Sequence, residues 1–352
     1  MVSPIYENYP RLMTMRTLRF HSHGEPAEVL QLEEAPLPSV AANRIRVAVH
    51  ACGLNPADWA LCKGLHPGQF PRGVGLDVSG VVDAIGEGVT DVAIGDRVVG
   101  AADFMSGASA GAADFAILDH WAVLPPNVDL VAAAALPLAV ETAALHLYAM
   151  NVQAEKTVLI NGAGTSVGFA AVQIALLRGA HVVATAGNTY QDRLRALGAK
   201  VTRYGEGLYA RLQALNVGPI DLALDTAPGV FDPKLVNELM RLHASKTEQK
   251  PGADGPLADV VRAVGGDPQR VVTISDLRSA ISLGVRTSLD LVSPDAATPS
   301  ARAVILRDCV RHAGASQLSI PIARTFPIEA WREALALSQS WQARGKLVLL
   351  LK

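Results

Sequence analysis

The central part of the sequence alternates between two kinds of apolar segment, and this alternation restricts the fold more than any other feature. Short runs such as TVLING (157–162) and HVVATA (181–186) are typical of buried strands. Longer stretches such as SVGFAAVQIALLRG (166–179) are typical of helices that end at glycine. Strands that alternate with helices form a parallel sheet with right-handed crossovers, so this region is predicted to be α/β. The other strands predicted here are 200–204, 221–226 and 270–275.

The segments on either side have a different character. The N-terminal part is rich in short alternating runs separated by Gly and Pro, which predicts an all-β region. An Ala-rich stretch (128–150) favours helix and is interrupted by Pro137. The polar stretch 243–255 is predicted to be an exposed loop. The chain closes with an amphipathic helix within 326–345 and a strand at 346–351.

Length and composition limit the class of protein. A chain of 352 residues is long enough for two domains, each with its own core. The formal charge of −2 provides no basic face for nucleic acid, and no apolar run reaches the roughly 18 residues of a membrane span. The polar N-terminus is unlike a signal peptide. With only three cysteines (Cys52, Cys62 and Cys309), we expect a cytoplasmic protein without a disulfide framework.

A glycine-rich turn follows the strand TVLING. In the sequence NGAGTSVG, taking Gly168 as the last glycine of a G-x-G-x-x-G pattern places Ala163 and Thr165 at the first two glycine positions. Such a turn binds the pyrophosphate of a dinucleotide through backbone N–H groups and the helix N-terminus. We expect Thr165 to push the pyrophosphate slightly outward, with Thr165, Ser166 and Val167 as its contacts. A tight strand-to-helix turn without a ligand is the alternative.

The second strand bears on the choice of cofactor. An acidic residue at its end would bind the ribose 2′-hydroxyl of NAD. The sequence HVVATAGNTY has none, which favours NADP, with Gly187, Asn188 and Tyr204 near the 2′-phosphate. Arg193 or Arg203 could supply positive charge, although both arginines could equally be solvated helix and strand ends.

Taken together, these stretches resemble the medium-chain dehydrogenase/reductase superfamily, in its zinc-free quinone oxidoreductase branch. The resemblance implies an α/β fold in which a GroES-like β-barrel catalytic domain (1–125 and 320–352) flanks a Rossmann domain with a doubly wound parallel sheet (126–319). The active site would lie in the cleft between them. The stretches that carry the resemblance are CGLNPADW, GLDVSGVVDAIGEGV, GDRVVG, AALPLAVETAAL, NGAGTSVGFAAVQIA, LRALGA, DLALDTAPG and GKLVLLL.

The positions of metal ligands in this superfamily are altered. Asn55 stands where its zinc alcohol dehydrogenases carry a cysteine, and Leu76-Asp77 stands where they carry a His-Glu pair. An amide and an isobutyl group cannot replace a thiolate and an imidazole around zinc. We therefore predict a protein without zinc. Without a Lewis acid, reduction of a quinone or an activated double bond is easier than oxidation of an alcohol.

The resemblance also implies roles for individual residues. Asn55 would lie near the nicotinamide ribose or the substrate, and Thr142 and Ser275 near the cofactor. Asp58 is expected to buttress the loop, and proton transfer is the alternative. Trp59 would line the substrate pocket.

Two further positions differ from many relatives. Ala60 stands where zinc-free relatives often carry a tyrosine, and Ala112 where they often carry an aromatic residue. If these differences are neutral, water or the Trp59 N–H would stabilise the enolate. If they are functional, the pocket is widened for a bulkier substrate, such as a polycyclic or polyketide-like intermediate.

The predicted function is therefore NADPH-dependent reduction of a quinone or an α,β-unsaturated carbonyl, with a small molecule as the only partner besides a second copy of the chain. A redox-inactive dinucleotide-binding protein, used for non-redox cyclisation or in a structural or regulatory role, is the alternative. By resemblance we expect a homodimer in which the segment 280–292 supplies an edge of the Rossmann sheet.

Overall fold

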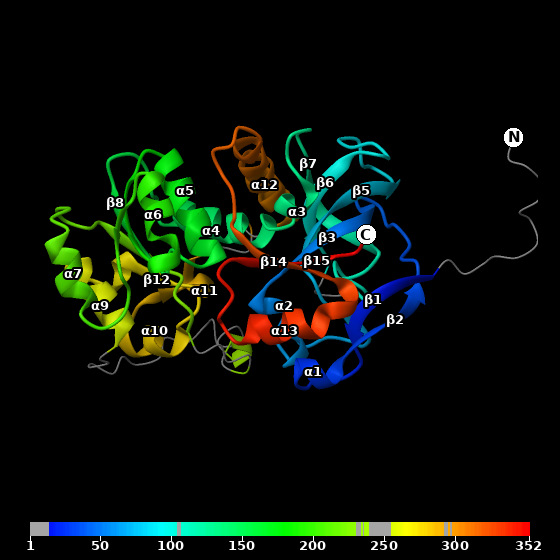
Figure 1. The fold of residues 1–352 in the computed structure, drawn as a ribbon, viewed down its shortest axis with the longest axis horizontal. Coiled ribbons are helices and arrows are strands. Elements are labelled where there is room, and N and C mark those ends of the chain that lie inside the picture. Colours follow the sequence, from blue (N-terminus) through cyan, green and yellow to red (C-terminus); the bar gives the residue numbers. More distant parts are fainter. Residues whose placement is uncertain are drawn as a thin grey trace, which may run out of the picture.

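The computed structural model describes residues 14–103, 107–229, 234, 236–238, 255–291, 295 and 298–352. Two β-sheet units lie side by side along the long axis of the molecule (Figure 1). One contains the N-terminal strands and the C-terminal strand, and the other contains the central α/β region. The chain thus returns to its first unit at its end, as the closing strand of the sequence requires.

The first unit is built around a six-stranded sheet of order β14-β15-β3-β5-β6-β7, in which β3 also pairs with β7. A three-stranded sheet, β2-β1-β4, packs beside it. The strands are β1 (Thr14–Phe20), β2 (Leu30–Pro36), β3 (Ile45–Leu54), β4 (Arg72–Gly73), β5 (Asp77–Ile85), β6 (Arg97–Ala102), β7 (Phe115–Val123), β14 (Ile322–Pro327) and β15 (Lys346–Leu350). The helices of this unit are α1 (Pro26–Val29), α2 (Pro56–Cys62) and α13 (Trp331–Gln339).

The second unit contains a six-stranded, wholly parallel sheet of order β10-β9-β8-β11-β12-β13. In chain order this is 3-2-1-4-5-6, the order of a dinucleotide-binding sheet. Its strands are β8 (Thr157–Asn161), β9 (His181–Thr185), β10 (Lys200–Thr202), β11 (Leu222–Asp225), β12 (Val271–Thr273) and β13 (Arg286–Thr287). The helices are α3 (Leu130–Ala133), α4 (Pro137–Ala149), α5 (Ser166–Leu177), α6 (Asn188–Ala196), α7 (Leu208–Ala214), α9 (Pro256–Ala263), α10 (Leu277–Leu283), α11 (Ser288–Leu291) and α12 (Pro299–Gly314).

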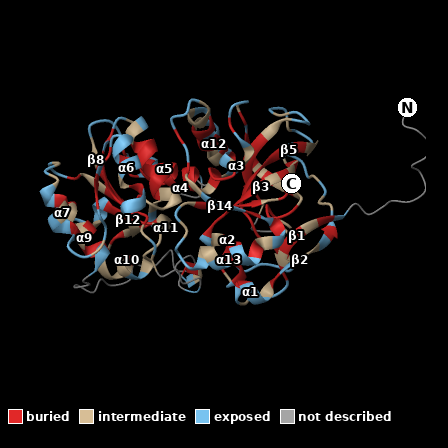
Figure 2. Ribbon diagram, viewed as in Figure 1, coloured by how far each residue is buried: buried red, intermediate tan, exposed pale blue. Residues whose placement is uncertain are grey.

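Both faces of the parallel sheet are buried, which explains why its strands read as continuous apolar runs. Side chains alternate between the two faces along each strand. Val158 and Ile160 pack with Phe169 of α5, whereas Leu159, between them, packs with Leu212 of α7 and other residues of the opposite layer. The buried residues therefore lie along the strands and on the inner sides of the helices (Figure 2). The predicted doubly wound arrangement is confirmed.

The observed elements follow the predicted ones closely, with one informative difference. The Ala-rich stretch does break at Pro137, which becomes the first residue of α4. The segment 280–292, however, is not one strand, because α10 and α11 flank a strand of only two residues, Arg286–Thr287. Asp276 caps α10, and this favours helix over an extended chain.

Some predictions fall on residues that the structure does not describe. The N-terminal 13 residues and almost all of the expected loop 243–255 lie outside the described ranges. Within those ranges no helix is long and apolar enough to cross a bilayer.

Candidate active site

The strand register brings three distant segments together at the end of β3. β15 pairs with β3 so that Leu347 lies opposite Leu54, and β5 pairs with its other edge so that Asp77 lies opposite Gly53. Lys346 and Asp77 therefore approach the next residue, Asn55, from opposite sides. A Cβ at Gly53 would lie 2.1 Å from the carbonyl oxygen of Ala134 and 2.9 Å from Cε of Lys346, so this approach requires glycine.

Asp77 is the centre of a buried polar cluster. Its Oδ2 accepts from Lys346 Nζ at 2.6 Å and from Asn55 Nδ2 at 3.0 Å, and its Oδ1 accepts from the backbone N–H of Leu138 at 2.8 Å. Lys346 Nζ also donates to Asn55 Oδ1 at 2.5 Å. All three side chains of the cluster are at most 5% exposed. The ammonium group of Lys346 thus bonds to both Asn55 and Asp77.

Asp58 lies one turn further along α2 and is 1% exposed. Its Oδ2 accepts from the backbone N–H of Asn55 at 2.7 Å, and its Oδ1 accepts from that of Gly75 at 2.9 Å. Burial raises the pKa of Asp58 to about 7, and the two backbone donors oppose this shift. The carboxyl group therefore holds the loop around Asn55, which is the buttressing role considered for it.

The next residues of α2 point toward α13 and toward the parallel-sheet unit. Trp59 donates from Nε1 to Ser338 Oγ at 2.7 Å, so its N–H already has an acceptor in this structure. Ala60 is 3% exposed and packs with Leu65 and Val236. The small side chain of Ala60 thus permits a close contact between the two units.

Ala112 lies elsewhere. It is fully buried in the core of the first unit, where its backbone bonds to Leu18 and Val74. The structure therefore does not bring Ala112 together with Ala60 at an open surface, because the segment before β7 that carries Ala112 is buried in this core.

The structure explains why Thr165 can stand at the second glycine position of the glycine-rich turn. Thr165 is the N-cap of α5, and its Oγ1 accepts from the Gly168 N–H at 3.0 Å and lies 3.1 Å from Thr226 Oγ1. A Cβ at Gly168 would lie 2.4 Å from the Gly162 carbonyl oxygen, so the third glycine permits close helix–strand packing. The Thr165 hydroxyl is thus committed to the protein, whereas Ser166 and Val167 lie in the first turn of α5, where N–H groups have no helical acceptor.

A buried polar network lies beneath this turn, at the carboxyl ends of four neighbouring strands. Asn161 donates to Asp225 at 2.7 Å and accepts from Thr185 at 2.6 Å, and Thr273 donates to Asp225 at 2.8 Å. Burial raises the pKa of Asp225, while these donors oppose the shift. Satisfied networks of this kind hold strand ends in fixed positions. Here the network holds the edge at which ligands bind in sheets of this topology.

The predicted 2′-phosphate region is assembled at the ends of β9 and β10. Gly187 and Asn188 begin α6, and a Cβ at Gly187 would lie 3.6 Å from the Tyr204 ring. Tyr204 is 55% exposed. Arg193, in contrast, is directed away, since it donates to Ser319 Oγ at 3.0 Å and stacks on Phe169. Of the two predicted arginines, the structure leaves Arg203 near this edge.

Thr142 and Ser275 take part in local hydrogen bonds. Ser275 Oγ donates to the Ala227 carbonyl oxygen, which joins the segments that follow β11 and β12. The carbonyl oxygen of Thr142 lies 2.6 Å from His146 Nδ1 on the same helix, α4. The first turn of α4 is capped by Asp77, so Thr142 and the buried Asp77 cluster are positioned by one helix.

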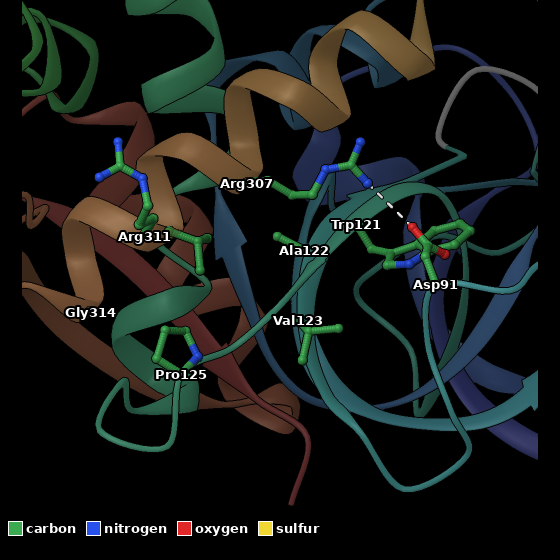
Figure 3. Close-up of a pocket in the computed structure, with 9 residues that line it drawn as sticks. Asp91, Trp121, Ala122, Val123, Pro125, Arg307, Arg311 and Gly314 are labelled. Carbon is green, nitrogen blue, oxygen red and sulfur yellow. Dashed lines mark hydrogen bonds and ion pairs between the residues drawn. The ribbon is translucent and has the colours of Figure 1, made fainter.

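Two cavities differ in their relation to these residues. One, of about 490 Å³, lies between the ends of β11 and β12 and the C-terminal segment. The other, of about 420 Å³, lies between α12 and β7, where Arg307 bonds to Asp91 beside Trp121 (Figure 3). Neither is lined by a predicted site residue, but the first is lined by Asp276, the neighbour of Ser275. The first lies at the sheet edge described above and is the better candidate for a ligand.

Comparison with known proteins agrees with this geometry. The alcohol dehydrogenase GroES-like domain family matches residues 41–125. A chloroplast envelope quinone oxidoreductase homolog of Arabidopsis thaliana is 32% identical over 63% of this chain and 72% of its own length. A trans-enoyl reductase of Alternaria alternata is 30% identical over 79% and 81%. A quinone oxidoreductase of Sus scrofa is 38% identical over 49% and 53%.

The chain belongs to the quinone oxidoreductase branch of the medium-chain dehydrogenase/reductase superfamily. The predicted family and fold class are thereby confirmed. The same fold occurs in the quinone oxidoreductase of Coxiella burnetii, with a TM-score of 0.69 and 23% identity over 97% of this chain and 100% of that one. The relatives support an oxidoreductase of this superfamily, and the superfamily suggests a nicotinamide dinucleotide as its cofactor.

The sequence does not predict that Lys346 and Asp77 meet beside Asn55. The sequence assigns Lys346 only to the closing strand and Asp77 only to the pair that stands where relatives carry His-Glu. Their contact joins residues 269 positions apart, and no local pattern encodes it. Asp77 and Lys346 are charged residues at the start of apolar strands. A charged residue that is buried needs a partner of opposite charge, and this is the one feature of the sequence that points to their contact.

We predict that Lys346→Met destabilises the protein by about 3–5 kcal/mol, because it leaves the buried Asp77 carboxylate without its cation. The double variant Lys346→Met, Asp77→Asn should recover much of this loss. Urea unfolding measures both. Lys63→Met is the matched control, since Lys63 and Glu25 form an exposed pair at 2.8 Å and its loss should cost about 0–1 kcal/mol. Equal losses in Lys346→Met and Lys63→Met would contradict the buried pair.

A second prediction concerns pH. The pKa of Asp58 is about 7 in the folded protein, against the ordinary 3.8, so between these values the folded state holds a proton that the unfolded state lacks. This stabilisation is complete below pH 3.8 and is lost as the pH rises through about 7, at about 1.4 kcal/mol per unit. Relative to the wild type, Asp58→Asn should therefore gain stability from pH 5 to pH 7, as urea unfolding would measure. The exposed Asp192→Asn should show no such trend, and a constant Asp58→Asn difference would refute the assignment.

Proposed function

We propose that this protein transfers hydride from NADPH to a quinone or an α,β-unsaturated carbonyl without a catalytic metal ion. The observation that carries the proposal is the Lys346 ammonium group, held by Asp77 and Asn55 at the position of the metal ligands. In the balanced reaction, NADPH, a proton and a quinone give NADP⁺ and a hydroquinone. Quinone oxidoreductases and a trans-enoyl reductase among the relatives support this substrate class.

The residues at the former ligand positions do not fit zinc. Leu76 offers no donor atom, and the Asn55 amide and the Asp77 carboxylate already bind a cation. A divalent ion at the same carboxylate would have to displace the ammonium group or lie within a few ångströms of it, where like charges repel. The chemistry therefore has to proceed without a Lewis acid at this place.

The other residues fit a dinucleotide. The first turn of α5 offers the N–H groups of Ser166 and Val167 to the pyrophosphate, at the positive end of the helix. No carboxylate follows β9, and Asn188, Tyr204 and Arg203 supply polar and positive groups near a 2′-phosphate. When bound, NADPH would supply the hydride. The protein's part is to orient the cofactor through these contacts and to hold Asn55 and Thr142 beside the reacting ring.

The substrate pocket is proposed to accept large substrates. Trp59 is held by Ser338 and Ala60 is packed against Leu65 and Val236, so the space proposed for a large substrate is the cavity of about 490 Å³ at the sheet edge. A bulky natural-product intermediate with a conjugated carbonyl is the proposed occupant of this cavity. The carbonyl oxygen of such a substrate takes up the negative charge that hydride addition creates.

The assay that tests the function follows NADPH absorbance at 340 nm with a panel of quinones and enones. We expect turnover that is unchanged in EDTA, an elemental analysis without stoichiometric zinc, and a lower KM for NADPH than for NADH. Asn188→Asp should reverse the coenzyme preference, because a carboxylate repels the 2′-phosphate and accepts from the 2′-hydroxyl. Asp192→Asn, a charge change on the same helix, serves as the control.

The outcomes separate the alternatives. Tight NADPH binding without turnover on any substrate would favour a redox-inactive dinucleotide-binding protein. Loss of activity in EDTA, with about one zinc per chain, would overturn the metal-free mechanism. A preference for NADH in the wild type would overturn the assignment of the 2′-phosphate site.

A homodimer is also proposed. β13 forms one edge of the parallel sheet, and within the described ranges no strand pairs with its outer side. An edge of this kind needs a partner or a cover, and a second copy related by a two-fold axis would provide one. Light scattering at micromolar concentration should give twice the 37.0 kDa of one chain. A mass of one chain would refute the dimer.

A further inference from the structure

The cavity at the edge of the parallel sheet is closed on one side by an aromatic residue from the first unit. Trp341 follows α13 and lines the cavity together with residues from the segments after β11 and β12. The opposite wall consists of Pro228, Gly229, Asp276, Arg278 and Ser279. The volume of about 490 Å³ lies within the range of ligand-binding sites.

Trp341 follows the C-cap of α13 and carries an exposed side chain on a left-handed backbone. Its side chain is 54% exposed, although exposed indoles are uncommon. Its φ of 56° is in the left-handed region, which is disfavoured for a bulky side chain. An exposed indole that lines a cavity is a candidate ligand contact.

The cavity is also lined by Gly229, where there is little room for a side chain. A Cβ at Gly229 would lie 2.7 Å from the Ser275 carbonyl oxygen, so a larger residue would not fit there. The space lined by Trp341, Pro228, Gly229, Asp276, Arg278 and Ser279 is called the slot. An exposed indole at such a space can stack on a planar group.

Hydrogen bonds join the segment of Trp341 to the helix that follows Asn55. Ser338, three residues before Trp341, accepts the hydrogen bond of the Trp59 indole at 2.7 Å through its side-chain oxygen. The backbone N–H of Trp341 donates to the Ser338 carbonyl oxygen. Trp59 belongs to α2, which begins directly after Asn55. The position of Trp341 relative to the candidate site is therefore determined by direct contacts.

We propose that Trp341 is a specificity-determining residue, which stacks on planar, polycyclic quinones or conjugated ketones and selects them over small ones. The proposal rests on the proposed function for the identity of the reacting group. It adds the substrate class of the site, namely fused planar ring systems. Stacking of the indole on such a ring should contribute about fivefold to tenfold in affinity.

The test compares 9,10-phenanthrenequinone with 1,4-benzoquinone in Trp341→Ala, Trp341→Phe and Tyr209→Ala. Tyr209 is an exposed aromatic residue on α7 that does not line the cavity, so it is the matched control. In Trp341→Ala we expect the KM for phenanthrenequinone to rise about fivefold to tenfold. The kcat/KM for benzoquinone and the KM for NADPH should stay within about twofold of the wild type. Trp341→Phe should retain most of the selectivity.

The outcomes distinguish this inference from the proposed function. If the wild type turns over quinones but Trp341→Ala leaves the ratio of the two kcat/KM values unchanged, the stacking role is wrong and the reductase function stands. A rise in the KM for NADPH alone would likewise overturn it, because Trp341 would then contact the cofactor. If no variant shows turnover, calorimetric titration with phenanthrenequinone decides: weaker binding to Trp341→Ala than to Tyr209→Ala supports the slot, and equal binding refutes it.

Discussion

A single buried carboxylate, that of Asp77, joins the parts of this protein on which its candidate site depends. One oxygen accepts from Lys346 of the last strand and from Asn55 at the end of β3, and the other accepts from the Leu138 N–H at the start of α4. Removing these charges from water is costly, and the attraction offsets that cost only when the geometry is complete. The C-terminal strand, the loop of Asn55 and the first turn of α4 are therefore held in one arrangement.

A second buried carboxylate, that of Glu141, also joins α4 to the first unit. His120 of β7 lies 2.8 Å from Glu141 of α4, and Arg302 of α12 lies 3.1 Å from the same carboxylate. Asp77 and Glu141 thus tie one helix to two strands of the first unit. Since Thr142 follows Glu141 directly, the two ion clusters limit how far Thr142 can move relative to Asn55.

The glycine-rich turn shows how a motif can change without losing its geometry. Thr165 replaces a glycine, yet its hydroxyl turns inward to cap α5 and to meet Thr226. The free N–H groups of the first turn remain available, while the one at Gly168 is satisfied by the protein. A hydroxyl that could have bound phosphate is thereby used to hold the helix against the sheet, where Gly168 permits the close approach.

The sequence by itself determined the elements and their order, because hydrophobic period, capping residues and glycines act over a few residues. It predicted the strands of the parallel sheet, the helix break at Pro137 and, through a recognisable order of motifs, the family. It placed the turn of Ser166 and the end of β9 correctly at one edge, since the carboxyl ends of parallel strands meet there.

The tertiary structure decided what each side chain does. Arg193 faces Ser319 rather than the cofactor edge, and Ala112 lies in a closed core, because neighbours from distant segments occupy the space around them. The ammonium group of Lys346 reaches Asn55 only because β15 pairs with β3, across 291 positions of sequence. Such contacts depend on strand register and burial, which are properties of the folded chain and which no local pattern of residues specifies.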